Sequence, residues 1–143
     1  DGLQAASETG AGLIIDAATL TGAAVMAVGS NYNAIFSPQK ATLQLAQQCA
    51  EAVSENVWPL PLDAWHKDMC PSAYADTANS RPVKGGGAGG ASNAAGFLWR
   101  FVSPKANWLH VDLAGAFESS ASALWAAGAT THGVLTIAEL LKD

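Results

Sequence analysis

The sequence predicts an α/β domain built in three layers (α/β/α), with a mixed, largely parallel sheet between two layers of helices. Short apolar segments of the kind found in buried strands occur at residues 13–15, 34–36 and 108–113. Longer segments between and after them carry apolar side chains at helical spacing. Alternation of this kind favours a largely parallel sheet, because a helix that connects two parallel strands packs back onto one face of the sheet.

The clearest helix is predicted to begin at Ser37-Pro38. The serine provides a hydroxyl for the N-cap, and proline suits the first helical position. Apolar side chains then recur on one face from Leu43 to Val53, which predicts a helix of about four turns. The other helices are expected at residues 1–9, 94–102 and 134–141.

Three further segments have compositions that limit what they can form. Trp58-Pro59-Leu60-Pro61-Leu62 is predicted to be extended, because each proline removes an amide donor and restricts the residue before it. Residues 79–90 are rich in glycine and are the loop expected to be most mobile. The pattern assigns no element to residues 17–29, which are small and interrupted by glycine.

The composition predicts a single domain over residues 1–143 whose surface is partly covered by other polypeptide. Of the residues 50% are hydrophobic and 13% are charged, whereas about 25% are charged in typical soluble domains. No apolar run approaches the ~18 residues of a membrane span, so no membrane partner is expected. The net charge is −5 and the seven Lys and Arg residues are scattered, which argues against a nucleic-acid partner.

The two cysteines, Cys49 and Cys70, have no second pair near them. Their spacing fits neither a zinc knuckle nor a disulfide scaffold, so we expect reduced, buried thiols in a cytoplasmic protein. No secretory signal is recognisable, and the opening Asp1-Gly2-Leu3 lacks an initiator methionine. The chain is therefore expected to be a fragment or a processed chain.

Two predicted strands end in small residues. Thr19-Leu20-Thr21-Gly22 follows the first strand, and Ala114-Gly115-Ala116-Phe117 follows the strand near residue 110. Ligands of α/β sheets bind beyond the carboxyl ends of the strands. If these strands are parallel neighbours, the two segments line opposite sides of one cleft. Phe117 then either closes a side-chain pocket or packs in the core.

Catalytic groups are scarce in this sequence. The histidines His66, His110 and His132 are isolated and form no paired ligand motif. His110 and Asp112 share one face of a strand, an arrangement that could ligate a metal, but a hydrogen-bonded structural histidine is the favoured interpretation of His110. The loop serines Ser119, Ser120 and Ser122 lie outside any Gly-x-Ser-x-Gly elbow.

The glycine run at residues 85–90 lacks both the Gly-Lys-Ser/Thr ending and the context of a dinucleotide-binding turn. It precedes a predicted helix whose free amides attract anions. A flexible loop or close backbone packing is the favoured interpretation, and anion binding is the alternative.

The chain resembles the leucine aminopeptidase (cytosol aminopeptidase) family, and within it the bacterial peptidase B branch. The likeness covers effectively all 143 residues and keeps the family's order. Its clearest motif is Asp16-Ala17-Ala18-Thr19-Leu20-Thr21-Gly22-Ala23. The other matching segments are Trp58–Leu62, Ala75–Asn79, Gly89–Leu98, Trp108–Gly115 and Ala127–Thr130.

This resemblance implies a hexameric aminopeptidase in which two divalent metal ions, zinc or manganese, activate water and bind the free amine of a peptide substrate. The family's metal ligands and catalytic lysine belong to motifs that precede the point where this chain begins. The chain is thus expected to be the C-terminal fragment of a metallo-aminopeptidase catalytic domain, with no catalytic or metal residue of its own, no bound metal and no activity alone. It would supply substrate-pocket and oligomer surfaces and need the missing N-terminal part of the same protein.

The resemblance also implies which residues hold substrate. Thr19 and Gly22 match positions that line the pocket for the N-terminal side chain, and Leu20 matches a residue whose backbone contacts the peptide. Ala114 matches the pocket floor. Phe117 occupies a wall position that is often Met in animal members.

Two other functions remain open at this point. The chain is either a fragment of the enzyme or a non-catalytic interaction and oligomerisation module that retains the fold. A nucleotide-binding domain that uses the glycine run is the third and least favoured alternative.

Overall fold

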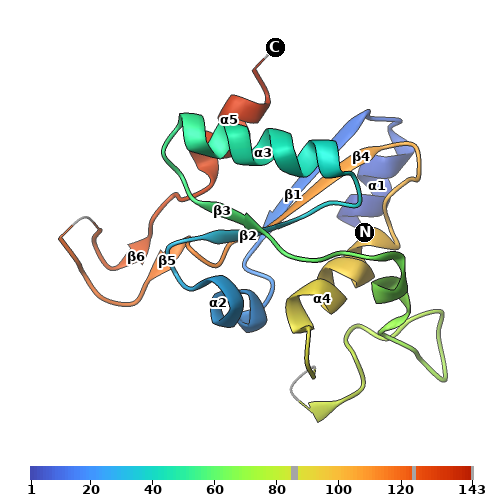
Figure 1. The fold of residues 1–143 in the computed structure, drawn as a ribbon. Coiled ribbons are helices and arrows are strands. Elements are labelled where there is room, and N and C mark those ends of the chain that lie inside the picture. The colour runs from blue at the N-terminus through green and yellow to red at the C-terminus, as the bar shows by residue number, and fades with distance from the viewer. Residues whose placement is uncertain (85–86, 124, 143) are drawn as a thin grey trace.

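The computed structural model covers the whole chain and describes residues 1–84, 87–123 and 125–142. Strands and helices alternate along most of that length (Figure 1). The helices are α1 (Gly2–Glu8), α2 (Gly22–Val28), α3 (Lys40–Ala52), the 3₁₀ helix η1 (Ala64–Asp68), α4 (Gly90–Trp99) and α5 (Val134–Leu140). The strands are β1 (Leu13–Ala18), β2 (Asn33–Phe36), β3 (Val57–Pro59), β4 (Asn107–Asp112), β5 (Phe117–Glu118) and β6 (Gly128–Ala129).

The main sheet is mixed and has the order β1-β4-β2-β3. β1 pairs with β4 in parallel, and β2 pairs with β3 in parallel. The central pair, β2 with β4, is antiparallel. The predicted mixed α/β sheet is therefore confirmed, and so is the parallel pairing of the first strand with the strand near residue 110. A separate small sheet joins β5 to β6 in antiparallel fashion.

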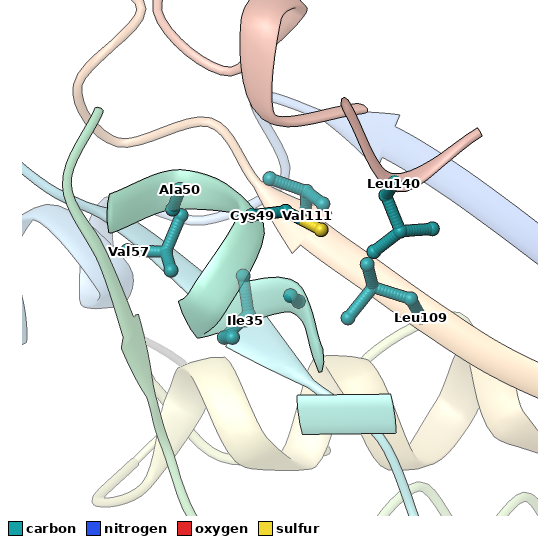
Figure 2. Close-up of a cluster of buried hydrophobic side chains, with 8 residues drawn as sticks. Ile35, Cys49, Ala50, Val57, Leu109, Val111 and Leu140 are labelled. Atoms are coloured by element: carbon teal, nitrogen blue, oxygen red, sulfur yellow. The ribbon is translucent and has the colours of Figure 1, made fainter. Parts of the chain in front are cut away.

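Helices α3 and α5 cover one face of the sheet, while α2 and α4 lie on the opposite face (Figure 1). This gives the three predicted layers. On the α3 side, Ile35, Leu109 and Val111 of the sheet pack against Ala46, Ala50 and Leu140 of the two helices (Figure 2). Cys49 is a free, buried thiol in the same cluster, as predicted. Alternate residues of β4 point to this face because side chains of a strand alternate between its faces.

The opposite face contains two smaller clusters. Ala24, Ala34, Phe36 and Ala95 pack where α2 and α4 approach the sheet. Small side chains prevail there, which lets the helices lie close to the strands. Further along, Trp108 is fully buried in a cluster with Ile14, Val102 and Ala106.

Several element boundaries differ from the sequence prediction. β1 runs to Ala18 rather than ending at residue 15, because β4 pairs with it along its whole length. Helix α2 occupies part of residues 17–29, where no element was assigned; Thr21 caps it by accepting a hydrogen bond from Ala24 N. The sequence prediction missed α2 because this segment has little apolar periodicity and has a glycine at each end, Gly22 and Gly29.

The helix predicted to begin at Ser37-Pro38 begins at Lys40. Ser37 Oγ accepts from Gln39 N, so the serine forms a turn before the helix rather than an N-cap. The Gln39 side chain instead reaches the amide of Trp108 in β4. Helix α4 likewise occupies Gly90–Trp99 and not residues 94–102. None of the helices in the described part of the chain is long and apolar enough to cross a membrane.

Candidate functional site

The ends of β1 and β4 flank a cleft of about 560 Å³. Thr19 and Gly22 lie on one side, after β1, and Ala114 and Phe117 lie on the other, after β4. The cleft follows from the parallel pairing, which brings both carboxyl ends to the same edge of the sheet. The structure thus brings together four of the five residues that the sequence singled out for substrate binding.

The fifth residue, Leu20, faces a neighbouring cavity of about 320 Å³ rather than the cleft. That cavity is also lined by Cys70, Asn79 and Arg81. Thr21 and Gly22 line both spaces, so the backbone of residues 20–22 separates them. Burial raises the pKa of the Cys70 thiol, although the positive charges of Arg100 and Arg81 act in the opposite direction.

A single carboxylate joins the two sides of the cleft. Asp112, the last residue of β4, is 1% exposed. Its Oδ1 accepts hydrogen bonds from Leu20 N at 3.0 Å and Thr21 N at 3.2 Å, and its Oδ2 accepts from Thr21 Oγ1 at 2.7 Å. Hydrogen bonds to an ionised acceptor are the stronger kind. Asp112 therefore fixes the peptide units that follow β1 against the end of β4.

Sequence reasoning considered Asp112 only as a metal ligand together with His110 and missed its contact with Leu20 and Thr21. The hydroxyl of Thr21 also accepts from Ala24 N at 3.0 Å, so the same threonine caps α2. A threonine before a run of small residues is a helix-start signal, and it was the available clue.

Phe117 belongs to the cleft and not to the core. Its side chain is 60% exposed, while its backbone pairs with Ala129 across the small β5-β6 sheet. The alternative of core packing is wrong for this reason. Its neighbour Ala114 is 7% exposed and forms part of the cluster beneath α2.

His110 makes the structural hydrogen bond that the sequence analysis favoured over metal ligation. Its Nδ1 lies 2.6 Å from Asp16 Oδ1, and Trp108 Nε1 donates to the other oxygen of that carboxylate at 2.6 Å. Because a carboxylate accepts only, Nδ1 of the imidazole is the donor. His110 Nε2 is buried and has no hydrogen-bond partner within the described residues.

The two metal ions that the family resemblance implies would need a group of carboxylate or imidazole ligands free to bind them. Asp112 is engaged by backbone and hydroxyl donors, and Asp16 by Trp108 and His110. Across residues 1–84, 87–123 and 125–142, no group of three or more His, Cys, Asp or Glu side chains is arranged to hold a metal ion. The described residues therefore do not fit a two-metal centre.

The loop before α4 is closed on itself by side chains. Arg81 Nη1 and Asn93 Nδ2 both donate to the carbonyl oxygen of Ala88. Asn93 lies in the first turn of α4, so its side chain returns to the loop from the helix. The anion site considered for the glycine run falls partly on Gly85 and Gly86, which lie outside the described residues.

Comparison with known proteins decides the family. The profile of the cytosol aminopeptidase family, catalytic domain, matches residues 1–138. This chain belongs to the cytosol aminopeptidase family. The resemblance drawn from the Asp16–Ala23 motif and the segments after it is thereby confirmed.

Curated relatives are named peptidase B, in agreement with the predicted branch. The chain is 48% identical over 144 residues to peptidase B of Vibrio parahaemolyticus, covering 100% of this chain and 33% of that protein. It is 44% identical over 142 residues to peptidase B of Pectobacterium carotovorum, covering 99% of this chain and 32% of that protein. The chain thus spans about a third of the length of the curated relatives it matches.

Solved structures agree on the fold. A mutant of tomato leucine aminopeptidase superposes with a TM-score of 0.83 at 36% identity, covering 98% of this chain and 26% of that one. The bottromycin maturation enzyme BotP, in a complex with Mn, gives a TM-score of 0.88 at 34% identity, covering 99% of this chain and 31% of that one.

Proposed function

We propose that this chain is the C-terminal part of a two-metal aminopeptidase and supplies its substrate-binding side. The cleft between Thr19, Gly22, Ala114 and Phe117 receives the side chain of the N-terminal residue of a peptide. The observation that carries this proposal is that four residues from two distant segments line one cleft at the carboxyl ends of adjacent parallel strands.

The chemistry of the cleft suits an amino-acid side chain. Gly22 and Ala114 leave room, and Phe117 presents an exposed aromatic ring. Leu20 contributes its backbone to the same substrate from the other side of the Thr19–Gly22 turn. Because Asp112 holds the Leu20 amide, the orientation of that peptide unit is set before substrate arrives.

Hydrolysis is assigned to metal ions held by the preceding part of the protein. Two divalent ions, zinc or manganese, would supply an activated water and bind the peptide's free amine. This assignment is supported by the family match, by the Mn complex of BotP, and by the lack of a suitable donor group in the described residues. The chain alone is therefore proposed to be inactive.

The same preceding part is proposed to cover β1. This strand is at one end of the main sheet, so one of its edges has no partner strand among the described residues. A cavity of about 630 Å³ beside it is lined by apolar residues of β1, α1 and α4, among them Ile15, Leu3 and Phe97. Helix α1 buries none of its residues. Exposed strand edges and apolar surface of this kind are usually covered by further polypeptide.

The low charge content and the exposed aromatic side chains are also consistent with subunit contacts, for which the resemblance implies a hexamer in the cytoplasm. Trp58, on the opposite edge strand β3, is 56% exposed and lies against Tyr32 in an edge-to-face contact. Such aromatic residues are enriched at protein interfaces.

The test compares two proteins. The first is the 143-residue chain, and the second is a full-length enzyme made by joining this chain to the remaining part of Vibrio parahaemolyticus peptidase B in place of the matching third. Both are assayed with Mn²⁺ and with Zn²⁺ on an aminoacyl chromogenic substrate. We expect turnover by the full-length enzyme and none by the chain.

Turnover by the purified chain alone would contradict the assignment of hydrolysis to the preceding part. A full-length protein that assembles into oligomers but does not cleave the substrate would favour the alternative function, a non-catalytic interaction module. Analytical ultracentrifugation of the same samples supplies the oligomeric state.

A further inference from the structure

Asn33 is a fully buried polar residue to which the proposed function gives no role. It is the first residue of β2 and is 0% exposed. Its Oδ1 accepts from Gly115 N at 2.9 Å, and its Nδ2 donates to His132 O at 3.1 Å. One end of the carboxamide must accept and the other must donate, so its orientation is fixed by its partners.

The peptide group that Asn33 contacts lies directly beside the cleft, in the segment that follows β4. Gly115 lies between Ala114 and Phe117, which both line the cleft. The N–H of Gly115 is held by Asn33, and its carbonyl oxygen accepts from Thr130 Oγ1 at 2.9 Å. Thr130 is 4% exposed. Both polar atoms of this glycine are therefore anchored by buried side chains.

The surrounding backbone leaves little room for Gly115 to move. A Cβ atom at this position would lie 3.0 Å from Ser30 O and 3.2 Å from Tyr32 O, which is tighter than nine in ten real Cβ contacts. The segment before β2 thus lies directly against Gly115. His132, the other partner of Asn33, leads into Gly133, where a Cβ atom would lie 2.9 Å from Asn33 Nδ2.

We propose that Asn33 is a positioning residue that sets the shape of the substrate cleft and hence which N-terminal side chain it prefers. This inference rests on the proposed function. Asn33 is not among the residues that line the cleft, so it does not touch the peptide. It acts through Gly115, whose placement fixes Ala114 and Phe117 relative to Thr19 and Gly22.

The preferred substitution is Asn33→Asp in the full-length enzyme. Aspartate keeps the size of the side chain and an acceptor for Gly115, but it replaces the donor with a second acceptor that faces the carbonyl of His132. The readout is the ratio of kcat/KM for leucyl and alanyl substrates. Because both values come from one sample, the fraction of folded enzyme cancels from the ratio.

Discrimination by a methylene-sized difference in an apolar pocket spans about 10–200-fold, so a displaced wall is expected to change the ratio by about tenfold. Asn107→Asp is the matched control. It makes the same substitution at the exposed first residue of β4, at the opposite end of that strand from the cleft. We expect its ratio to stay at the wild-type value.

A second pair of variants decides the matter if Asn33→Asp does not fold. Thr130→Val removes the hydroxyl that holds the Gly115 carbonyl while keeping the shape of the side chain, and Thr130→Ser retains that hydroxyl. We expect Thr130→Val to change the ratio in the same direction as Asn33→Asp. Thr130→Ser is expected to keep the wild-type ratio of kcat/KM values for leucyl and alanyl substrates.

The outcomes separate the two proposals. An active wild-type enzyme whose ratio is unchanged by Thr130→Val, and by Asn33→Asp where that variant folds, overturns the role of Asn33 and leaves the proposed function standing. A change of equal size in Asn107→Asp or in Thr130→Ser overturns it as well. A wild-type full-length enzyme that hydrolyses neither substrate overturns the proposed function, and the role of Asn33 with it.

Discussion

Replacing Asp112 by asparagine tests whether the cleft is held together as the structure indicates. The carboxylate of Asp112 receives three hydrogen bonds from the segment after β1, and it is 1% exposed. A hydrogen bond to a charged group contributes about 1.5–3 kcal/mol and a neutral one roughly half of that. Asparagine no longer buries a charge, which offsets part of the loss. We therefore expect Asp112→Asn to destabilise this segment by about 2 kcal/mol.

The assay is amide hydrogen exchange of the full-length enzyme, followed by mass spectrometry of peptides that contain Leu20, Thr21 and Ala24. A loss of 2 kcal/mol corresponds to exchange about 30-fold faster where local opening controls it. Asp68→Asn makes the same change of charge on an exposed side chain that lies 4.0 Å from Arg100. Its effect is expected to be negligible.

Unchanged protection of residues 20–24 in Asp112→Asn would show that this carboxylate does not hold the turn. Equal effects of Asp112→Asn and Asp68→Asn would also refute the reasoning, because a general effect of charge would then explain both.

Three further substitutions test other parts of the structure. Gly96→Ala places a Cβ atom 2.6 Å from the backbone of His66, so we expect the free energy of unfolding to fall by about 1–3 kcal/mol in thermal denaturation. In the control Gly2→Ala the new Cβ atom meets no atom within 4 Å, so stability should be unchanged. Similar melting temperatures for both variants would contradict the packing of Gly96 against His66. Burial tends to raise the pKa of Glu55, but hydrogen bonds from the N-terminus of α5 outweigh burial and hold that pKa below its ordinary value of 4.5. Glu55 therefore stabilises the fold above that pH, and the contribution is lost as the pH falls through the folded-state pKa. In urea titrations, Glu55→Gln should flatten this pH dependence of stability, and an unaltered profile would contradict the role of Glu55. Phe117→Ala removes the exposed ring from the cleft, so relative kcat/KM should rise for bulky N-terminal side chains, and a preference identical to wild type would place substrate elsewhere.

The sequence predicted the position of the cleft because two local signals sufficed. Apolar runs located the strands, and the small residues after Ala18 and after Leu113 showed that no large side chains fill the space beyond these two strand ends. The rule that parallel strands end at one edge then brought Thr19 and Ala114 together, as the pairing of β1 with β4 confirms. That these residues hold a peptide's side chain stays a prediction.

The contacts that hold the cleft in place were not predictable in this way. Asp112 reaches Thr21 across 91 positions, and Asn33 reaches Gly115 across 82. Neither residue has a neighbour in sequence that signals its partner, because such hydrogen bonds depend on which strands become adjacent. The start of α3 differed for the same reason, since Gln39 bonds to β4 instead of extending the helix.

The most direct test of the central claim is a crystal structure of the full-length enzyme with a non-hydrolysable peptide analogue. We predict that the analogue's N-terminal side chain lies between Gly22 and Ala114 and contacts the ring of Phe117. A side chain seated instead in the neighbouring cavity beside Leu20 and Cys70, or away from both strand ends, would contradict the account.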